Sequence, residues 1–223
     1  MNLSSKNSLN KKIIHTILIV GSLLMVIPFI WMLLTSFKTL MESMQVPPTV
    51  MPKEFVASNY KNAISILPFF TFYLNTIIVI LVRVTISTFF AAMAAYAFAR
   101  IKFPGREILF LFVLIQMMVP GQIFIIPQYL MVQKLGMLNS ISALVFPGIV
   151  TAFGTFLLRQ FFMGLPEEIE EAAIIDGANR WQIFWRVMLP LAKQGMISLS
   201  IITASFPWKD HMRPLIVQDG FDK

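Results

Sequence analysis

Few residues of this chain are suited to catalysis or metal binding. The 223-residue sequence has no cysteine, which excludes disulfides, thiolate metal sites and cysteine nucleophiles. Its histidines are His15 and His211, and His211 has no second candidate ligand nearby, so we expect no metal site. The sequence also lacks a G-x-x-x-x-G-K-[ST] phosphate loop. We therefore predict no catalytic residue, no cofactor and no nucleotide site within this chain.

Polar groups gather instead in one segment, EEAAIIDGANRWQIFWRVMLPLAKQG, from Glu170 to Gly195. Six of its residues are charged, in a chain in which 13% of residues are. Pro166 and the following glutamates suit the start of a helix, and Asp176-Gly177 predicts its end with a left-handed glycine. Asn179 and Gln182 have the spacing of a capping box, which predicts a second short helix.

That second helix is expected to end at Leu189-Pro190 and to present an apolar ridge, formed by Trp181, Phe184, Trp185 and Met188. A ridge that is too short to span a membrane and too apolar for water requires a partner. One interpretation is a helix lying on lipid headgroups, although such helices usually carry Lys and Arg rather than acidic residues. A protein partner is the favoured interpretation.

The remaining sequence predicts an all-α, polytopic membrane bundle. Hydrophobic residues make up 57% of the chain, and they occur in blocks of about 20 residues or more, enough to cross a bilayer. No ten-residue alternation of the kind found in β-barrels is visible. About five spans are expected, at approximately residues 13–37, 72–98, 108–132, 141–162 and 194–217. Residues 1–12 are expected to form a cytoplasmic N-terminus before the first span. Residues 36–71 are predicted to form an extended surface loop with at most one or two helical turns.

The basic residues predict the orientation. The net charge of +7 is interpreted as cationic loops at the cytoplasmic face rather than as a nucleic-acid site. With the N-terminus in the cytoplasm, that face receives Lys6, Lys11, Lys12, Arg100, Lys102, Arg106, Arg180, Arg186 and Lys193, and the outside receives Lys38, Lys53, Lys61 and Lys134. We therefore expect a multi-pass protein of a prokaryotic plasma membrane, in contact with lipid, whose polar segment faces the cytoplasm.

The second span has two notable features. Alanines at 91, 92, 94, 95, 97 and 99 predict close approach of a neighbouring helix. Arg83 lies near the middle of the span, where a charged side chain is costly unless paired or hydrated. It either lines a translocation pathway or pairs with a partner subunit, or it is an interior-facing or snorkelling structural residue.

The polar segment resembles the cytoplasmic motif of ABC importer permeases, roughly E-A-A-x-x-D-G-A followed by Leu-Pro. The matching residues are Glu171, Ala172, Ala173, Asp176, Gly177, Ala178, Leu189 and Pro190. Three further stretches, AAYAFARIKFPGREILF, MMVPGQIFIIPQYLMVQKLGMLNS and FLLRQFFMGLPEEIEEAA, are similar to binding-protein-dependent sugar permeases of the maltose-transporter type. The resemblance covers most of residues 60–217.

This resemblance implies a MetI-like fold, with an ABC transmembrane type-1 domain at residues 13–223 and a cytoplasmic coupling segment at residues 165–192. It implies a permease subunit that forms the pathway for a solute, expected to be a sugar or oligosaccharide. The implied partners are a second permease subunit, ATP-binding ATPase subunits and an extracellular solute-binding protein. The chain itself is then not an enzyme, because ATP hydrolysis belongs to the separate ATPase.

The resemblance also implies roles for individual residues in coupling to the ATPase. Ala172 and Ala173 would allow close approach to a cleft of the ATPase, and Glu171 would pair with a basic residue there. Gly177 would permit the turn, Asp176 would close it by a hydrogen bond, and Pro190 would end the second helix. For all six residues the alternative is simple helix capping.

The terminal stretch PWKDHMRPLIV is similar to a family stretch that usually reads W-N-D-F-L-x-P-L-I-V. Trp208 fits it and is a candidate pathway residue with Arg83, whereas Lys209, His211 and Arg213 depart from the pattern. Family members continue into a sixth helix, so we expect this chain to be truncated, with the sixth helix missing. The alternative functions are a non-transporting membrane scaffold and a permease for a solute other than a sugar.

Overall fold

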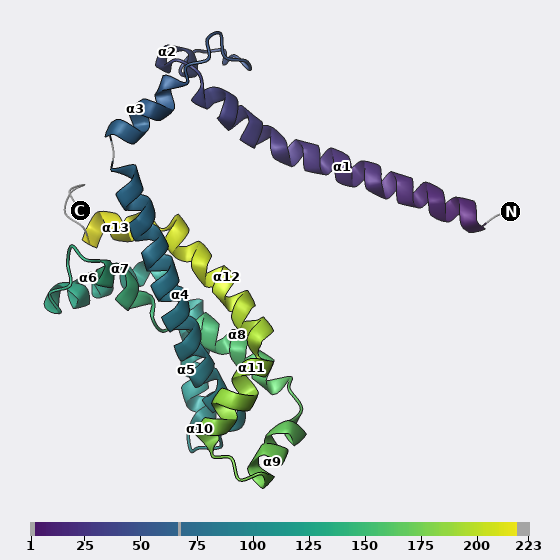
Figure 1. Cartoon of the computed structure of the whole chain (residues 1–223), viewed down its shortest axis with the longest axis vertical. Helices are drawn as coiled ribbons and strands as arrows, with labels where there is room; N and C mark the ends of the chain where they lie inside the picture. The colour runs from purple at the N-terminus through teal and green to yellow at the C-terminus, as the bar shows by residue number, and fades with distance from the viewer. Residues whose placement is uncertain (1–2, 67, 218–223) are drawn as a thin grey trace. The chain divides into compact units, whose positions relative to one another are not determined.

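The computed structural model describes residues 3–66 and 68–217, and these residues form helices and no strands. The predicted all-α class is therefore confirmed. The chain divides into two compact units, Met1–Pro68 and Phe69–Lys223. Figure 1 shows the order of the helices along the chain. The predicted domain extends to residue 223, and its residues 218–223 lie outside the described part.

The first unit contains α1 (Leu3–Ser36), α2 (Leu40–Ser43) and α3 (Ser58–Ile66). From Lys11 to Ser36, α1 is long and apolar enough to cross a membrane. Its large apolar side chains are exposed within the unit from Ile13 to Leu33. An apolar helix without an internal core to cover it is suited to contact with lipid or with another apolar helix.

The loop after α1 is more structured than the expected extended segment. Helix α3 has nine residues, more than the one or two turns predicted. The carboxylate of Glu42 is buried and accepts hydrogen bonds from the Thr49 hydroxyl at 2.8 Å and from the backbone N–H of Lys53 at 3.0 Å. The Asn59 side chain of α3 also donates to the carbonyls of Ser36 and Lys38. The expectation was wrong because these contacts organise a loop that composition alone describes only as polar.

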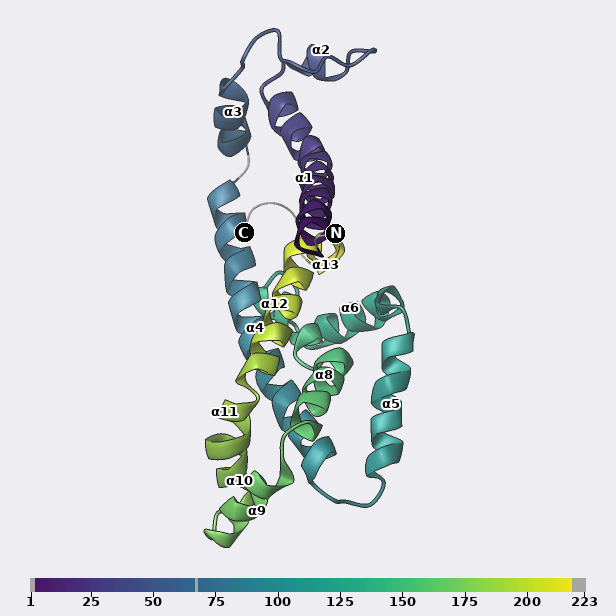
Figure 2. The same cartoon turned by 90° about the vertical axis from the view of Figure 1, so that its right-hand side faces the viewer.

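The second unit contains α4 (Phe69–Arg100), α5 (Arg106–Met118), η1 (Gly121–Phe124), α6 (Ile125–Lys134), α7 (Ile141–Val145), η2 (Phe146–Gly148), α8 (Ala152–Met163), α9 (Glu167–Ile175), α10 (Arg180–Ile183), η3 (Phe184–Met188), α11 (Leu189–Leu191), α12 (Lys193–Lys209) and α13 (Met212–Val217). Helix α4 is its central element and packs against both α8 and α12. Figures 1 and 2 show α9 and α10 near the C-terminal end of α4, and α13 beside its first half.

Small residues bring these helices together, as the alanine pattern predicted. Ala91, Ala92 and Ala95 have almost no exposed surface and form one core cluster with Leu158 and Phe162 of α8. A Cβ atom added at Gly154 would lie 3.1 Å from Cβ of Ala91 and 3.2 Å from Cδ2 of Leu199, on α12. The backbones of the three helices therefore approach closely where side chains are smallest, which strengthens packing in lipid.

Sharp bends interrupt the other apolar segments. Among the described residues, only α1 and α4 are long and apolar enough to cross a membrane as single helices. The bends are 100° between α5 and η1–α6, 48° between α7–η2 and α8, and 73° between α10–α11 and α12. Five spans result if each bent pair crosses as one unit, so the five-span arrangement stays a prediction.

The 100° bend has a local cause at Pro120. Val119, which precedes this proline, has the extended conformation φ −84°, ψ 124°. Proline disfavours the helical conformation of the residue before it and cannot donate a backbone hydrogen bond. The third expected span, residues 108–132, is therefore not one straight helix, and Figure 2 shows the chain turning sharply between α5 and α6.

We predict that Ala95→Leu destabilises the second unit by about 1–3 kcal/mol, because the added atoms would overpack a core without space for them. Thermal unfolding of the detergent-solubilised protein measures the effect. Ala94→Leu is the matched control, since Ala94 lies on the same helix, is only partly buried and is outside the core cluster. Equal melting temperatures for the two variants would contradict the packing described.

Candidate functional site

Two parts of the second unit bring polar residues together: the coupling segment, residues 165–192, and a cavity beside Arg83. The first helix of the coupling segment, α9, ends in a glycine turn. Gly177 has φ +79°, and the N–H of Ala178 donates to the carbonyl of Ala173 at 3.0 Å while that of Gly177 donates to Ile174 at 3.0 Å. This is a Schellman arrangement, in which glycine takes the left-handed conformation at no steric cost.

The second helix begins with the predicted capping box. The Asn179 side chain accepts from the N–H of Gln182 at 2.9 Å, and the Gln182 side chain accepts from the N–H of Asn179 at 2.9 Å. The turn between α9 and α10 is thus closed by backbone bonds and this box. Among the described residues, none forms a hydrogen bond with the Asp176 carboxylate, so the expected closure by that side chain is absent from this structure.

The second helix differs from its prediction in two ways. Phe184 and Met188 are buried in the core cluster, so the outward ridge contains only Trp181 and Trp185, which are about half exposed. The chain also continues through a π-helical turn, η3, and past Pro190 to Leu191. Pro190 therefore lies in the last turn of a continuous helix, directly after the π-helical turn, and does not end the helix by itself.

Glu170 is the buried polar centre of the coupling segment. Its Oε1 accepts a hydrogen bond from the Tyr96 hydroxyl at 3.1 Å and lies 2.5 Å from Nη1 of Arg180. Its Oε2 lies 3.9 Å from Nε of Arg100. One carboxylate therefore joins the end of α4, the middle of α9 and the start of α10. Buried carboxylates of this kind are stable only when paired and hydrogen-bonded.

Arg100 extends the same network to α8. Its side chain is 6% exposed and donates to the carbonyl of Phe162 from Nε at 3.2 Å and from Nη2 at 2.7 Å. It also donates to the carbonyl of Leu165 and lies 3.7 Å from the exposed Glu167. Phe162 lies in the last turn of α8 and Leu165 lies just after it, so the guanidinium caps the C-terminal end of that helix.

Arg159 makes the reciprocal contact from α8 to α4. Its Nε donates to the carbonyl of Phe98, in the last turn of α4, at 3.2 Å. Its guanidinium also lies over the ring of Phe110 at 4.0 Å and 3.8 Å from the Glu107 carboxylate. Each of α4 and α8 thus supplies an arginine that satisfies carbonyls at the end of the other.

The residues predicted to couple to an ATPase lie mostly on the outer surface of this framework. Glu171, Ala172, Asp176, Gly177 and Pro190 are exposed. Ala173 is instead partly buried and packs against the core cluster. The sequence did not predict the contacts among Glu170, Tyr96 and Arg100. Its one indication of them was that Arg100 ends an otherwise apolar helix.

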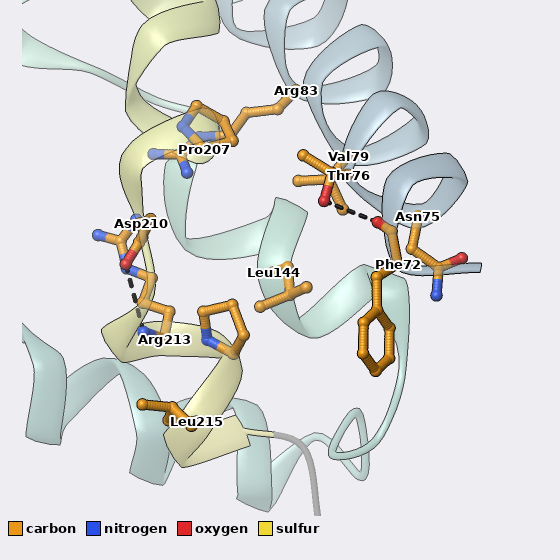
Figure 3. A pocket seen from close by; sticks show the side chains of 11 residues that line it. Phe72, Asn75, Thr76, Val79, Arg83, Leu144, Pro207, Asp210, Arg213 and Leu215 are labelled. Carbon is orange, nitrogen blue, oxygen red and sulfur yellow. Dashed lines mark hydrogen bonds and ion pairs between the residues drawn. The ribbon is translucent and has the colours of Figure 1, made fainter. Parts of the chain in front are cut away.

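The cavity lies by the first half of α4, away from the coupling segment. It has a volume of about 370 Å³, and Figure 3 shows the side chains around it. Its lining comes from α4, α7, the end of α12 and α13: Phe72, Asn75, Thr76, Val79, Arg83, Leu144, Pro207, Asp210, Arg213, Pro214 and Leu215. Arg83, a predicted pathway residue, is therefore part of this lining.

Trp208, the other predicted pathway residue, is not among the side chains that line the cavity. It is 60% exposed and makes an edge contact with the ring of Tyr73, with centroids 6.3 Å apart. Its neighbours Asp210 and Arg213 do reach the lining, and Arg213 Nη1 lies 3.3 Å from Asp210 Oδ2. The structure thus brings Arg83 together with a residue, Arg213, that departs from the resembled pattern.

Comparison with known protein families identifies the family of this chain. Residues 84–219 match the model of the binding-protein-dependent transport system inner membrane component. The chain belongs to this family. It is accordingly a membrane permease subunit of an ATP-binding-cassette importer, as the resemblance predicted.

Individual relatives match most of this permease. It is 33% identical over 211 residues to the diacetylchitobiose uptake system permease protein NgcG of Streptomyces coelicolor, covering 94% of this chain and 70% of that protein. It is 30% identical over 209 residues to the sn-glycerol-3-phosphate transport system permease protein UgpE of Yersinia enterocolitica, covering 91% and 74%. These relatives are transport permeases rather than enzymes.

The fold also has a solved counterpart. A crystal structure of a bacterial ABC transporter involved in the import of the acidic polysaccharide alginate contains a chain that superposes with a TM-score of 0.80. The alignment covers 99% of this permease and 77% of that chain, at 24% sequence identity. The likeness supports the MetI-like fold.

We predict that Glu170→Gln lowers the stability of the permease by about 1–3 kcal/mol, the usual effect of losing hydrogen bonds to a buried charge. Glu171→Gln, one residue away and exposed, should change it by less than about 0.5 kcal/mol. Thermal unfolding of the two detergent-solubilised variants, side by side, provides the measurement. A larger loss from Glu171→Gln than from Glu170→Gln would mean that Glu170 is not the centre of the network.

Proposed function

We propose that this permease forms part of the pathway for a sugar or oligosaccharide, and that its coupling segment docks on a separate ATPase subunit. A second permease subunit and an extracellular solute-binding protein complete the transporter. The N-terminus and the coupling segment lie on the cytoplasmic side. The observation that carries the proposal is an exposed, two-helix surface held on a buried ionic anchor in a permease that has no phosphate loop of its own.

The shape of that surface supports docking. Glu171 and Ala172 are exposed on α9, and Ile175 next to the turn is the most exposed large apolar side chain of the segment. Exposed apolar groups surrounded by charges are typical of protein interfaces. Trp181 and Trp185 add aromatic surface, and aromatic residues often contribute most of the binding energy of an interface.

The anchor supports transmission of force. Glu170 and Arg100 connect α9 and α10 to the ends of α4 and α8 through buried contacts. A movement imposed on the coupling segment would therefore be transmitted to the central helix rather than absorbed locally, because packed elements shift between discrete arrangements. Basic residues at the ends of these helices also support the cytoplasmic orientation.

The proposed solute class rests on the relatives. NgcG is named for diacetylchitobiose, and a permease of Halalkalibacterium halodurans, AraQ, that is 35% identical over 149 residues is named for arabinooligosaccharides. Both names describe short sugars. The cavity supplies an aromatic ring, Phe72, and polar side chains, Asn75 and Thr76, which are groups suited to a sugar.

We predict that Gly177→Val reduces co-purification of the ATPase subunit by about tenfold. Left-handed backbone costs about 1–2 kcal/mol in ordinary residues and more in β-branched ones, so valine would open the turn. Gly177→Asn is the matched control and should retain the ATPase, since asparagine tolerates this conformation. The measurement is the amount of ATPase recovered with the affinity-tagged permease from membranes that express the whole transporter.

A double variant, Glu171→Lys with Gly177→Val, tests the docking surface directly. Full recovery of the ATPase with this variant would show that the ATPase binds elsewhere. Uptake of radiolabelled disaccharide by cells with the complete transporter tests the solute class. No uptake of any sugar by a transporter that retains its ATPase would overturn that part of the proposal.

A further inference from the structure

Arg83 is a charged side chain in the middle of the longest apolar helix of the second unit. It is 7% exposed, and among the described residues its buried Nε has no hydrogen-bond partner. In Figure 3 its side chain extends from α4 toward Pro207, along one edge of the cavity. An unpaired polar group at this depth carries a large free-energy cost. Among the described residues, no group pairs with this guanidinium, and an anionic group would complete the site.

The charges around Arg83 do not supply that group. Asp210 is the acidic residue of the lining, and its carboxylate is engaged by Arg213, whose Nη1 lies 3.3 Å away and whose backbone N–H donates at 3.3 Å. No ion pair joins Arg83 to Asp210 within the described part of the chain. The lining thus contains two guanidinium groups and one carboxylate, an excess of one positive charge.

Gly148 holds the guanidinium in place. A Cβ atom at this position would overlap with Nε, Cζ and Nη2 of Arg83. The plane of the guanidinium therefore rests on the bare backbone of η2, and any larger residue at 148 would displace it. Arginine presents its N–H groups in a rigid fork that matches the oxygens of a carboxylate or phosphate.

We propose that this cavity binds an anionic group of the transported solute, with Arg83 as the residue that selects it. This inference rests on the proposed function and narrows its solute to a sugar or polyol that carries a carboxylate or phosphate. The volume of about 370 Å³ is near the lower end of the range for small-molecule pockets, roughly 300–1,000 Å³. It suits one acidic sugar unit, with its charge at Arg83 and its ring near Phe72.

Binding to the full chain in phosphatidylcholine nanodiscs tests the proposal, measured by saturation-transfer NMR at low salt. The probes are galacturonate and glucose 6-phosphate, with galactose and glucose as their neutral counterparts. We expect at least one acidic probe to bind about tenfold more tightly than its neutral counterpart, the usual strength of hydrogen bonds to a charged group. The two acidic probes distinguish a carboxylate from a phosphate.

Variants assign the effect to Arg83. Arg83→Gln should remove the preference for acidic over neutral probes, while Arg83→Lys should retain part of it. Gly148→Ala keeps the charge but displaces the guanidinium, and should weaken acidic binding by several-fold. Size-exclusion chromatography and ATPase recovery show that each variant is folded and assembled, since Arg83 is remote from the coupling segment.

Three results would overturn the proposal. The first is equal binding of acidic and neutral probes to the unaltered chain. The second is displacement of the acidic probes by short-chain phosphatidylcholine added at the same concentration, which would identify a lipid phosphate as the partner of Arg83. The third is failure of Arg83→Gln to retain a second permease subunit, which would identify an acidic residue of that subunit. Because the NMR measurement needs no ATPase, failure of ATPase docking would leave this result interpretable.

Discussion

The guanidinium of Arg100 is the contact on which the arrangement of the second unit depends. It satisfies carbonyls at the end of α8 and faces the carboxylate of Glu170 on α9. Removing it would take donors away from these carbonyls and from the buried carboxylate, and the loss is costly in a medium of low polarity. Helices α4 and α8 are further joined by Arg159, so their ends are fixed to each other from both sides. The coupling segment is built on this fixed end.

Helix α4 then relates the two candidate sites. Tyr96 and Arg100 lie at its end beside the coupling segment, and Arg83 lies 17 residues from Arg100, about 25 Å at 1.5 Å per residue. Helix α12 packs along α4 and spans the same interval, starting after the coupling segment and ending at the cavity. A displacement of α9 and α10 therefore has two continuous, close-packed routes to the cavity. Close packing transmits such a displacement because it leaves little free volume to absorb it.

The sequence predicted the turn and the helix cap, which depend on residues close together along the chain. It missed the features that depend on tertiary contacts. The left-handed Gly177 and the Asn179–Gln182 box follow from residue types within a few positions, and both predictions were confirmed. The pairing of Glu170 with Tyr96 joins residues 74 positions apart, and no spacing rule connects them. For the same reason Phe184 and Met188 were predicted to face outward, although the tertiary core covers them. The cavity could not be predicted, because α4, α7, α12 and α13 together form it.

Two arginines buried on the same helix show why burial alone does not identify a functional residue. An arginine has five N–H donors and no acceptor. Arg100 uses its donors on two carbonyls and faces two carboxylates, so its surroundings within the chain account for its presence. Arg83 is equally buried, yet its Nε has no partner among the described residues and the adjacent carboxylate is engaged by Arg213. In the described part of the chain, the charge of Arg83 instead borders a cavity of about 370 Å³.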